Sequence, residues 1–234
     1  MSIQLHPVAI AHTPFKEKFA IPRQPLLAPA AKGRIQLLPP YNQAEALQGL
    51  EQVSHVWLIF QFHKALAKQE GQPSLRVRPP RLGGNKKIGV FASRSTHRPN
   101  SLGQSLVKLD RVEASCLGVS GLDLLDGTPI VDIKPYIAYA DSLPEAINTI
   151  AESAPHIILV TWAEAALAEA QLHGQRLGDD VEALIHQCLQ QDPKPAYQQP
   201  EADRQYGVRL WDLNVQWHYP EPDLIRVLSV EQLI

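Results

Sequence analysis

Apolar and polar residues alternate in short runs along the first two thirds of the chain. Each run is rich in β-branched or large apolar residues, and glycine, proline or asparagine separates it from the next run. The pattern predicts strands at residues 8–13, 34–38, 55–62, 88–93, 105–114, 118–125 and 129–133. Because almost no helical periodicity interrupts these seven strands, the pattern favours a mainly β fold, an antiparallel barrel or closed sheet, over a doubly wound α/β fold.

Two connections between the predicted strands carry local signals. Asn42 is followed three residues later by Glu45, a capping-box spacing that predicts a short helix over residues 42–50. Residues 80–85, PRLGGN, contain paired glycines and predict a hairpin turn. They fit neither the GxGxxG of a dinucleotide site nor the GxxxxGK[ST] of a phosphate-binding loop, so neither kind of nucleotide site is indicated.

The pattern changes after Pro144, where a connection rich in small residues leads away from the predicted barrel. We expect a boundary there between a barrel domain at residues 1–148 and a small α+β C-terminal domain at residues 149–234. In the second domain the pattern predicts a strand at 156–162, helices at 163–173 and 179–191, and strands at 206–219 and 223–230. The 206–219 run reads alternately, with one face formed by Trp211, Leu213, Val215 and Trp217, and the turn at 220–223 makes a hairpin with the last run.

The composition is that of an ordinary globular protein, with 234 residues of which 44% are hydrophobic and 20% charged. Cys116 and Cys188 lie far apart and outside any CxxC or Cys/His ligand spacing, so neither a disulfide framework nor a metal site is predicted. The amino terminus lacks the pattern of a signal peptide, and no apolar run approaches the roughly 20 residues of a membrane span. We therefore expect a cytoplasmic protein with no membrane partner.

The formal net charge of −2 conceals an uneven distribution of charged residues. Between Glu70 and Asp110 there is no acidic residue, and the window contains Arg76, Arg78, Arg81, Lys86, Lys87, Arg94, Arg98 and Lys108. This window carries about +8, so the rest of the chain carries about −10. It predicts either a basic face for phosphates on an acidic body or a solvated surface whose partners come from elsewhere in the fold.

The stretch ASRSTHRPNSLGQS, residues 92–105, combines cations with hydroxyls. Arg94 and Arg98 offer planar donors that suit a phosphate or a carboxylate, and a helical turn opened by Pro99 would add backbone amides to an anion site. The alternative is a surface loop whose arginine stems pack on apolar neighbours. His97 is more typical of a surface residue than of a catalytic base.

The stretch LDLLDGTPIVDIKPY, residues 122–136, places Asp123, Asp126 and Asp132 around a strand, a turn and another strand. DGTP is first a turn signal, in which Asp126 caps its own backbone. The functional alternative is that one carboxylate accepts a hydrogen bond from a ligand or lies near a positive centre. Buried carboxylates would need partners, for which Lys134, Arg94 and Arg98 are the candidates.

Five stretches together resemble one family: IPRQP at 21–25, RPPRLGGN at 78–85, IGVFASRSTHRPNSLGQSLV at 88–107, LDLLDGTPIVDIKPY at 122–136 and QDPKPAY at 191–197. They are similar to the bacterial TrmO family of tRNA methyltransferases, also called YaeB or TsaA-like. The resemblance runs from about Val8 to Trp217. It implies a TsaA-like β-barrel that binds S-adenosylmethionine, a small C-terminal domain that helps to engage tRNA, a homodimer, and N6-methylation of threonylcarbamoyladenosine at position 37 of tRNA.

The same resemblance implies roles for individual residues. It implies that the cofactor is surrounded by Pro22, Arg23, Gln24, Phe62, His63, Arg94, Leu102, Asp123, Leu124, Leu125 and Asp126. It assigns the anionic tRNA substrate to Arg98, Asn100, Lys134 and Tyr197. For the residue that takes the proton from the nitrogen, the candidates are Asp126, Tyr136, Asp132 and His63, with Asp126 and Tyr136 preferred.

Two other classes of function remain open from the residues alone. One is a non-catalytic RNA-binding or nucleotide-sensing module that uses the same basic window without chemistry. The other is a small hydrolase, which has weaker support because no set of nucleophile, histidine and carboxylate is evident.

Overall fold

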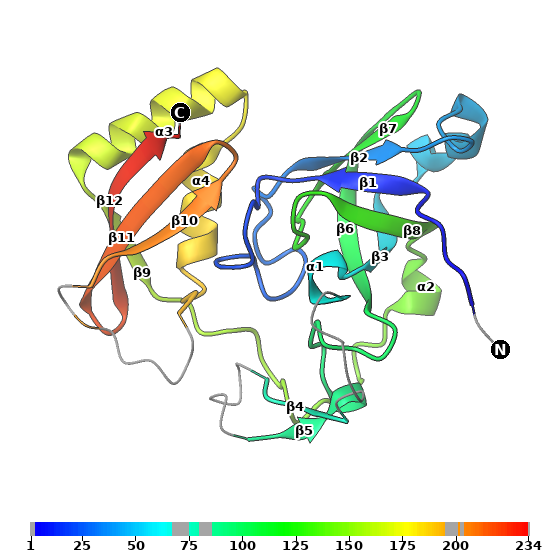
Figure 1. Cartoon of the computed structure of the whole chain (residues 1–234), viewed down its shortest axis with the longest axis horizontal. Helices are drawn as coiled ribbons and strands as arrows, with labels where there is room; N and C mark the ends of the chain where they lie inside the picture. Colours follow the sequence, from blue (N-terminus) through cyan, green and yellow to red (C-terminus); the bar gives the residue numbers. More distant parts are fainter. Residues whose placement is uncertain (1–2, 67–74, 80–85, 195–200, 202–203, 234) are drawn as a thin grey trace.

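The alternating runs of the first two thirds close into a barrel (Figure 1). The structure, a computed structural model, describes residues 3–66, 75–79, 86–194, 201 and 204–233. The barrel strands are β1 (Ala9–His12), β2 (Gly33–Leu37), β3 (His55–Gln61), β6 (Leu102–Glu113), β7 (Cys116–Ser120) and β8 (Thr128–Pro135). They pair in the order β1-β2-β7-β6-β3-β8, every pair antiparallel, so the predicted barrel is confirmed.

The barrel interior follows directly from the alternation in each strand. In β3, Val56, Leu58 and Phe60 are buried while the residues between them are partly exposed. The neighbouring strands add Ile35, Val107, Leu117 and Ile130, all fully buried. Burying each such side chain contributes about 1.5–3 kcal/mol, which stabilises closure of the sheet.

The antiparallel order gathers the connections of the barrel at its two ends. One end, called here the loop end, carries the long connections at residues 13–32, 62–101 and 121–127. The other, called here the hairpin end, carries the connection at 38–54, the β6–β7 turn at 114–115 and the exit of the chain from β8. The barrel therefore presents three long segments, distant in the sequence, at one rim.

Three local predictions for the barrel are wrong in part. The run at 88–93 forms only the short strand β5 (Ile88–Gly89) before the chain turns in the 3-10 helix η4 (Val90–Ala92). The run at 118–125 ends as a strand at Ser120, because Gly121 adopts a left-handed conformation with φ 76°.

The predicted helix at 42–50 is also replaced, by two 3-10 turns, η1 (Ala44–Leu47) and η2 (Leu50–Gln52). Gly49 between them has φ 93°, which interrupts any continuous helix. The residue at the N-cap of η1 is Gln43, with no side-chain capping bond, so the capping box predicted for Asn42 and Glu45 does not form.

The connection between β3 and β6 forms a small projection from the loop end. It begins with the helix α1 (His63–Leu66), and β4 (Arg76–Val77) pairs with β5 in an antiparallel two-stranded sheet. Residues 75–79 and 86–92 are called here the arm, which stands away from the barrel wall (Figure 1). The turn predicted at 80–85 lies outside the described residues.

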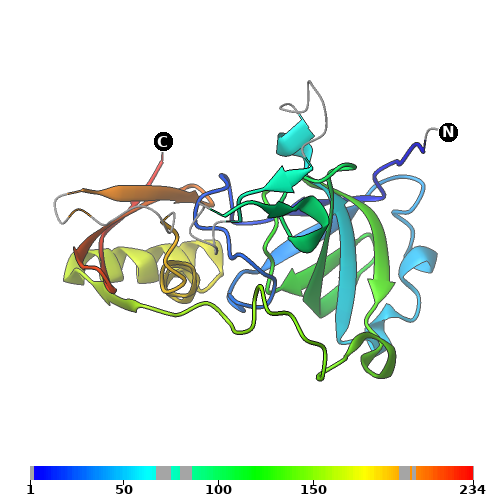
Figure 2. The same ribbon diagram turned by 90° about the horizontal axis from the view of Figure 1, so that it is seen from below.

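The C-terminal part is a four-stranded sheet with two helices on one face (Figure 2). After α2 (Ala138–Asp141), it comprises β9 (Leu159–Trp162), α3 (Glu164–Leu177), α4 (Val181–Leu189), β10 (Tyr206–Leu210), β11 (Leu213–Glu221) and β12 (Leu224–Gln232). The strand order is β10-β11-β12-β9, with β9 parallel to β12. Both predicted helices and the hairpin across 220–223 are confirmed.

The run at 206–219 is not one strand but a hairpin. Leu210 pairs with Leu213 across a tight turn at Trp211, which has φ 52°. Leu213, Val215 and Trp217 are fully buried as the alternation predicts, but the turn leaves Trp211 only partly buried. The alternation changes phase here, from even-numbered buried positions in β10 to odd-numbered ones in β11, and the prediction of one continuous strand overlooked this change.

The connection at 13–32 joins the barrel to the C-terminal sheet (Figure 1). Phe15 forms an isolated bridge with Leu210, and the Trp211 backbone N–H donates to the Pro14 carbonyl at 2.7 Å. Phe19 stacks on Trp217, with ring centroids 5.8 Å apart. The buried apolar residues of both parts form one continuous core through this segment.

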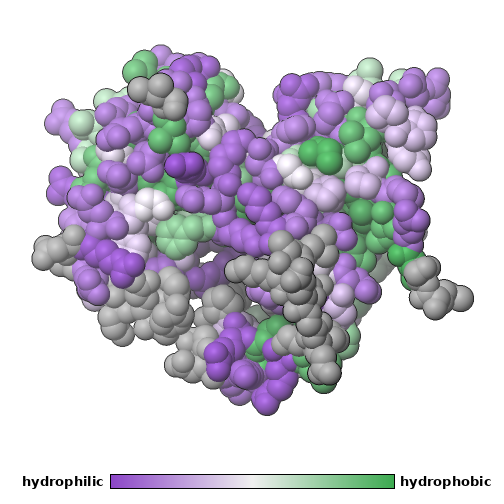
Figure 3. All heavy atoms as spheres, viewed as in Figure 1, coloured by the Kyte–Doolittle hydropathy of each residue, from purple (hydrophilic) through white to green (hydrophobic). Residues whose placement is uncertain are grey.

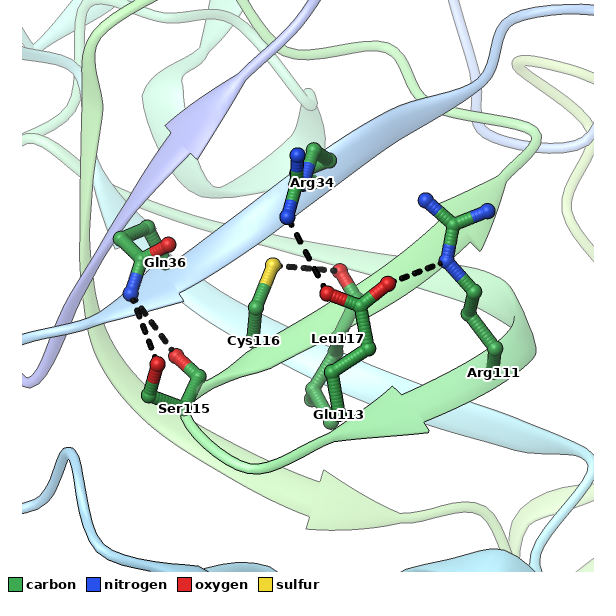
Figure 4. Close-up of polar contacts among 7 residues, drawn as sticks. All are labelled: Arg34, Gln36, Arg111, Glu113, Ser115, Cys116 and Leu117. Carbon is green, nitrogen blue, oxygen red and sulfur yellow. Dashed lines mark hydrogen bonds and ion pairs between the residues drawn. The ribbon is translucent and has the colours of Figure 1, made fainter.

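At the hairpin end, an exposed charge cluster ties β2 to β6 (Figure 4). Glu113 accepts from Arg34 at 3.1 Å and from Arg111 at 2.7 Å. The Gln36 side chain donates to the Ser115 carbonyl in the β6–β7 turn at 3.0 Å. Cys116 is buried close by and is free, as is Cys188 in α4, where burial raises the pKa of the thiol to about 12.

Candidate active site

The loop end of the barrel brings four polar side chains together from four segments. The Ser105 hydroxyl of β6 donates to the Asp123 carboxylate at 2.6 Å. Arg94 lies near enough to Asp123 to act on its charge, and Arg94 Nη1 also donates to the Gln24 side-chain oxygen. Three of these residues, Gln24, Arg94 and Asp123, are predicted cofactor residues.

Local geometry explains why Asp123 projects into this position. Gly121 ends β7 in a left-handed conformation, and its carbonyl accepts from the Leu26 backbone N–H at 2.9 Å. The connection at 121–127 is thereby held against the segment that carries Gln24. Ser105 lies on the inward face of β6 and is almost fully buried, so its hydroxyl reaches Asp123 from inside the barrel.

The environment of Asp123 changes its acidity. Burial raises the pKa of Asp123 from its ordinary value to about 6, and the hydrogen bond from Ser105 and the charge of Arg94 offset only part of that effect. A carboxyl group that titrates so near neutral pH is uncommon outside functional sites.

An apolar surface lies beside the polar cluster. Phe60 and Phe62 meet edge to face with centroids 5.1 Å apart, and the Phe62 backbone N–H donates to the Ser101 carbonyl at 2.7 Å. A Cβ atom on Gly103 would lie 2.5 Å from the Phe60 ring, so a larger residue there would force the ring or the strand to shift. Leu102 is partly buried between Gly103 and Ser101.

Ser101 is fully buried, has φ 51°, and its hydroxyl oxygen has no hydrogen-bond partner among the described residues. A buried hydroxyl without a partner is costly unless a ligand or water satisfies it. Together with the Phe rings it forms mixed apolar and polar surroundings, which are typical of small-molecule sites.

Much of the loop at 93–98 is engaged in hydrogen bonds within the loop. Ser93 Oγ donates to the Val90 carbonyl and accepts from the Ser95 N–H, and Arg98 Nη1 donates to the Ser93 carbonyl at 2.7 Å. Residues 98–101 form a single turn, with the Ser101 N–H donating to the Arg98 carbonyl, so the helical turn proposed for Pro99 is absent. Asn100 is exposed at this turn.

Asp126 has protein partners on both carboxylate oxygens. It accepts from the Thr13 backbone N–H at 2.8 Å and from Lys16 Nζ at 2.7 Å, so its partner is Lys16 and not Lys134 or an arginine of the 92–105 stretch. Burial alone would raise the pKa of Asp126, but the bonds from Lys16 and Thr13 outweigh it and lower the pKa. A carboxylate held in its charged form in this way is a weak base.

The remaining predicted cofactor residues lie on the same connections. Pro22, Leu124 and Leu125 are buried and shape the rim. Arg23 points instead to the C-terminal part, where Nη2 donates to the Asp192 carbonyl at 3.2 Å and to the Lys194 carbonyl at 3.4 Å. It therefore attaches the IPRQP segment to the QDPKPAY stretch.

Among the candidate bases, His63 is at the loop end, directly after Phe62. Burial, followed by the charges of Lys64 and Lys18, lowers the pKa of His63. The imidazole is therefore neutral at pH 7 and can accept a proton.

Tyr136 lies at the hairpin end, because its N–H donates to the carbonyl of His55 at the start of β3. With about 3.3 Å per residue, β3 separates Tyr136 from His63 by roughly 20 Å. Lys134 pairs with Trp57, near the same end, and Asp132 is exposed on the barrel wall. The structure therefore does not bring Tyr136, Lys134 or Asp132 to the loop-end cluster, and Tyr197 lies outside the described residues.

Sequence reasoning missed three residues of this region: Ser105, Lys16 and Lys18. Ser105 had a visible signal, a polar residue at an inward position of an alternating strand. Lys16 and Lys18 had none, since their neighbours lie 110 and 46 residues away in the chain. Within the described ranges, no three His, Cys, Asp or Glu side chains gather as a metal site would require.

Comparison with known proteins identifies the family. The family model described as the tRNA-methyltransferase O N-terminal domain matches residues 10–142, and that of the TrmO C-terminal domain matches residues 155–233. The chain belongs to the tRNA-methyltransferase O family, so the resemblance found in the sequence is confirmed. In the part of the chain that the structure describes, no helix has the length and apolar character to cross a membrane.

Individual relatives match over nearly the whole chain. A Pseudomonas aeruginosa protein named "Putative S-adenosylmethionine-dependent methyltransferase RcsF" is 62% identical over 98% of both chains. The tRNA (adenine(37)-N6)-methyltransferase of Escherichia coli is 45% identical over 92% of this chain and 93% of its own. The crystal structure of TrmO from Pseudomonas aeruginosa superposes with a TM-score of 0.84 at 54% identity, covering 99% of this chain and 100% of that one.

Proposed function

We propose that the protein is an S-adenosylmethionine-dependent tRNA methyltransferase that methylates N6 of the adenine at position 37 of tRNA. The observation that carries this proposal is the loop-end cluster of Asp123, Ser105, Arg94 and Gln24 in a chain of this family. The names of the Escherichia coli and Pseudomonas aeruginosa relatives support the reaction and the cofactor.

The residues at the loop end fit this cofactor. S-adenosylmethionine supplies a methyl group activated by a sulfonium cation. The Asp123 carboxylate suits the cofactor's positive groups or hydroxyls, and the Arg94 guanidinium suits its carboxylate. Phe62, Leu102 and the unpartnered Ser101 hydroxyl offer apolar surface and one polar group for its adenosine part. Pro22, Gln24, Leu124 and Leu125 complete the rim.

Catalysis then depends mainly on orientation. Holding the reacting atoms collinear and in contact supplies roughly 7–11 kcal/mol, and three connections anchored to one another and to the barrel provide a rigid frame for this. The attacking nitrogen must also lose a proton. Among the candidate bases we assign this role to His63, because its ring is neutral at pH 7 and lies at the loop end, whereas Asp126 is neutralised by Lys16.

We extend the proposal to the modified nucleoside. In threonylcarbamoyladenosine, N6 carries a threonyl group with its own carboxylate, and Arg98 and Asn100 flank the cofactor residues on the chain. A guanidinium there suits that carboxylate or a neighbouring phosphate. Lys134 and Tyr197 remain proposed tRNA contacts, and for Lys134, at the hairpin end, such a contact would require a second copy or an extended tRNA.

The proposal includes the division of the chain and its assembly. Residues 1–148 form the cofactor-binding domain, and residues 149–234 form the domain that assists tRNA binding. Exposed apolar residues on the connecting segment, including Tyr139 and Ile147, support a homodimer. The place of action is the cytoplasm, where tRNA is modified.

The test is methyl transfer from radiolabelled S-adenosylmethionine to tRNA purified from cells that lack this activity. We expect label in an N6-methylated nucleoside at position 37, and none with tRNA that lacks the threonylcarbamoyl group. Label on unmodified adenosine would contradict threonylcarbamoyladenosine as the substrate nucleoside but not the methyltransferase activity. Retention of tRNA without any label would contradict the enzyme and favour a non-catalytic RNA-binding module.

A further inference from the structure

The arm exposes an aromatic ring beside a second apolar side chain. Phe91, in η4, is 79% exposed, and Leu75, just before β4, is 76% exposed. The two positions are adjacent because the Val90 backbone N–H donates to the Leu75 carbonyl at 3.0 Å. Single exposed apolar residues are ordinary on protein surfaces, but an exposed pair on a projecting element is typical of an interaction surface.

The charged residues in the described part of the arm are all cations. The described part of the arm contains Arg76, Arg78, Lys86 and Lys87, all exposed, and the chain has no acidic residue between Glu70 and Asp110. Arg76 Nη2 donates to the Lys87 carbonyl at 3.1 Å, so this cation is held against the two-stranded sheet. Figure 3 shows apolar atoms next to strongly hydrophilic ones over the arm.

The arm is also coupled directly to the candidate active site. The Ser93 hydroxyl donates to the Val90 carbonyl at 3.1 Å, which ties η4 to the loop that follows it. Arg94, one residue further along, reaches Gln24 and the charge of Asp123. A ligand resting on Phe91 would therefore lie on the same connection as Arg94, three residues before it in the chain.

We propose that Phe91 is a stacking platform for an unpaired nucleobase of the RNA substrate, with the arm's cations on the adjacent phosphates. This rests on the proposed function, because it concerns the substrate of the same site. Charge complementarity favours RNA as the occupant: an exposed ring on an arm whose described charged residues are all arginine or lysine suits a base whose neighbours on both sides are phosphates. Stacking on an aromatic ring is tolerant of base identity, as a platform for a base beside the target requires.

The experiment compares Phe91→Leu, Phe91→Tyr and a control, Leu172→Ala, in the full-length protein. Leu172 is an exposed apolar residue on α3, away from the arm. Binding is measured with a fluorescent anticodon stem-loop RNA, and cofactor binding by calorimetry. We expect Phe91→Leu to weaken RNA binding about 5- to 100-fold without altering the salt dependence, since no charge is lost. Phe91→Tyr and Leu172→Ala should bind as the parent does, and cofactor affinity should not change.

Several outcomes overturn the stacking role. One is equal RNA affinity of Phe91→Leu and the parent; another is equal loss with Phe91→Tyr. A third is a drop in molar mass by light scattering with Phe91→Leu, which would make the surface an interface between two copies of the chain. A failure of the proposed function looks different: the parent would bind RNA in a Phe91-dependent manner and transfer no methyl group. If Phe91→Leu methylates tRNA normally, with unchanged RNA affinity and unchanged KM, the stacking role is wrong and the proposed enzyme activity stands.

Discussion

The two ends of the barrel contain similar side chains in different surroundings. At the hairpin end, Arg34, Arg111 and Glu113 form ion pairs that remain open to solvent. At the loop end, Asp123 is half-buried between Ser105 and Arg94, and its pKa rises to about 6. The comparison teaches that burial, more than the presence of charged partners, decides which carboxylate has a raised pKa. An exposed ion pair is worth little, whereas a buried carboxylate is maintained at a cost to stability.

The largest effect is expected for Asp123→Asn, which preserves size and removes the charge. We expect kcat/KM for methyl transfer to fall about 100-fold or more, as when a preorganised charged group is removed from an active site. Glu113→Gln at the hairpin end is the matched control and should transfer methyl groups normally. Normal turnover by Asp123→Asn would remove Asp123 from the site.

The same substitution should stabilise the fold. Because the folded-state pKa of Asp123 is raised to about 6, the folded protein binds this proton more tightly than the unfolded chain, so stability is lost as pH rises through that range. Asp123→Asn should therefore raise the free energy of unfolding at pH 7 by on the order of 1–3 kcal/mol. The difference in the free energy of unfolding between the variant and the parent should disappear below about pH 4. A variant that is less stable at pH 7 would show that Asp123 is not strained by burial.

A smaller effect is expected from Gly103→Ala, which tests how tightly the loop end is packed. The new Cβ would lie 2.5 Å from the Phe60 ring, so the strand or the ring must shift. Such overpacking costs about 1–3 kcal/mol, which denaturant unfolding would measure. Gly89→Ala is the control, because nothing lies within 4 Å of its added Cβ. Equal stabilities of the two variants would show that the Phe60 ring moves freely.

Asp126→Asn is expected to cost about 1 kcal/mol at neutral pH, since the Lys16 pair is partly exposed and screened by solvent. The lowered pKa of Asp126 means that its contribution is present above the unfolded pKa and is lost as pH falls through the lower folded value. The stabilities of the parent and the variant should therefore converge below about pH 3. Lys16→Met distinguishes the ion pair of Asp126 from a direct contact between Asp126 and the cofactor. If Asp126→Asn loses more cofactor affinity than Lys16→Met does, Asp126 contacts the cofactor directly.

The smallest effect belongs to Glu113→Gln. Exposed pairs of this kind contribute about 0.2–1 kcal/mol, and we expect the loss to shrink further in 1 M salt. Thermal unfolding at two salt concentrations measures it. A loss above about 2 kcal/mol would mean that the hairpin end depends on its charges as much as the loop end does.

The sequence by itself determined which residues face the barrel interior and where the C-terminal helices run. Val56, Leu58 and Phe60 alternate because a strand turns every second side chain inward, and the α3 and α4 patterns follow from local helical preference. Breaks that depend on a single left-handed residue, such as Gly49 and Gly121, were not visible in the periodicity. A run of apolar residues continues through them, and the conformation of one residue leaves no trace in a pattern of many.

Only the tertiary structure decided how the candidate site is assembled. The family resemblance placed Gln24, Arg94 and Asp123 near a cofactor, but Arg94 and Gln24 are 70 residues apart, and Ser105 and Asp123 are 18 apart. Their meeting depends on the strand order, which brings three distant connections to one rim while sending Tyr136 to the other. Local periodicity reports which face of a strand is buried. It does not report which strand lies beside it, because that choice is made by the packing of the whole barrel.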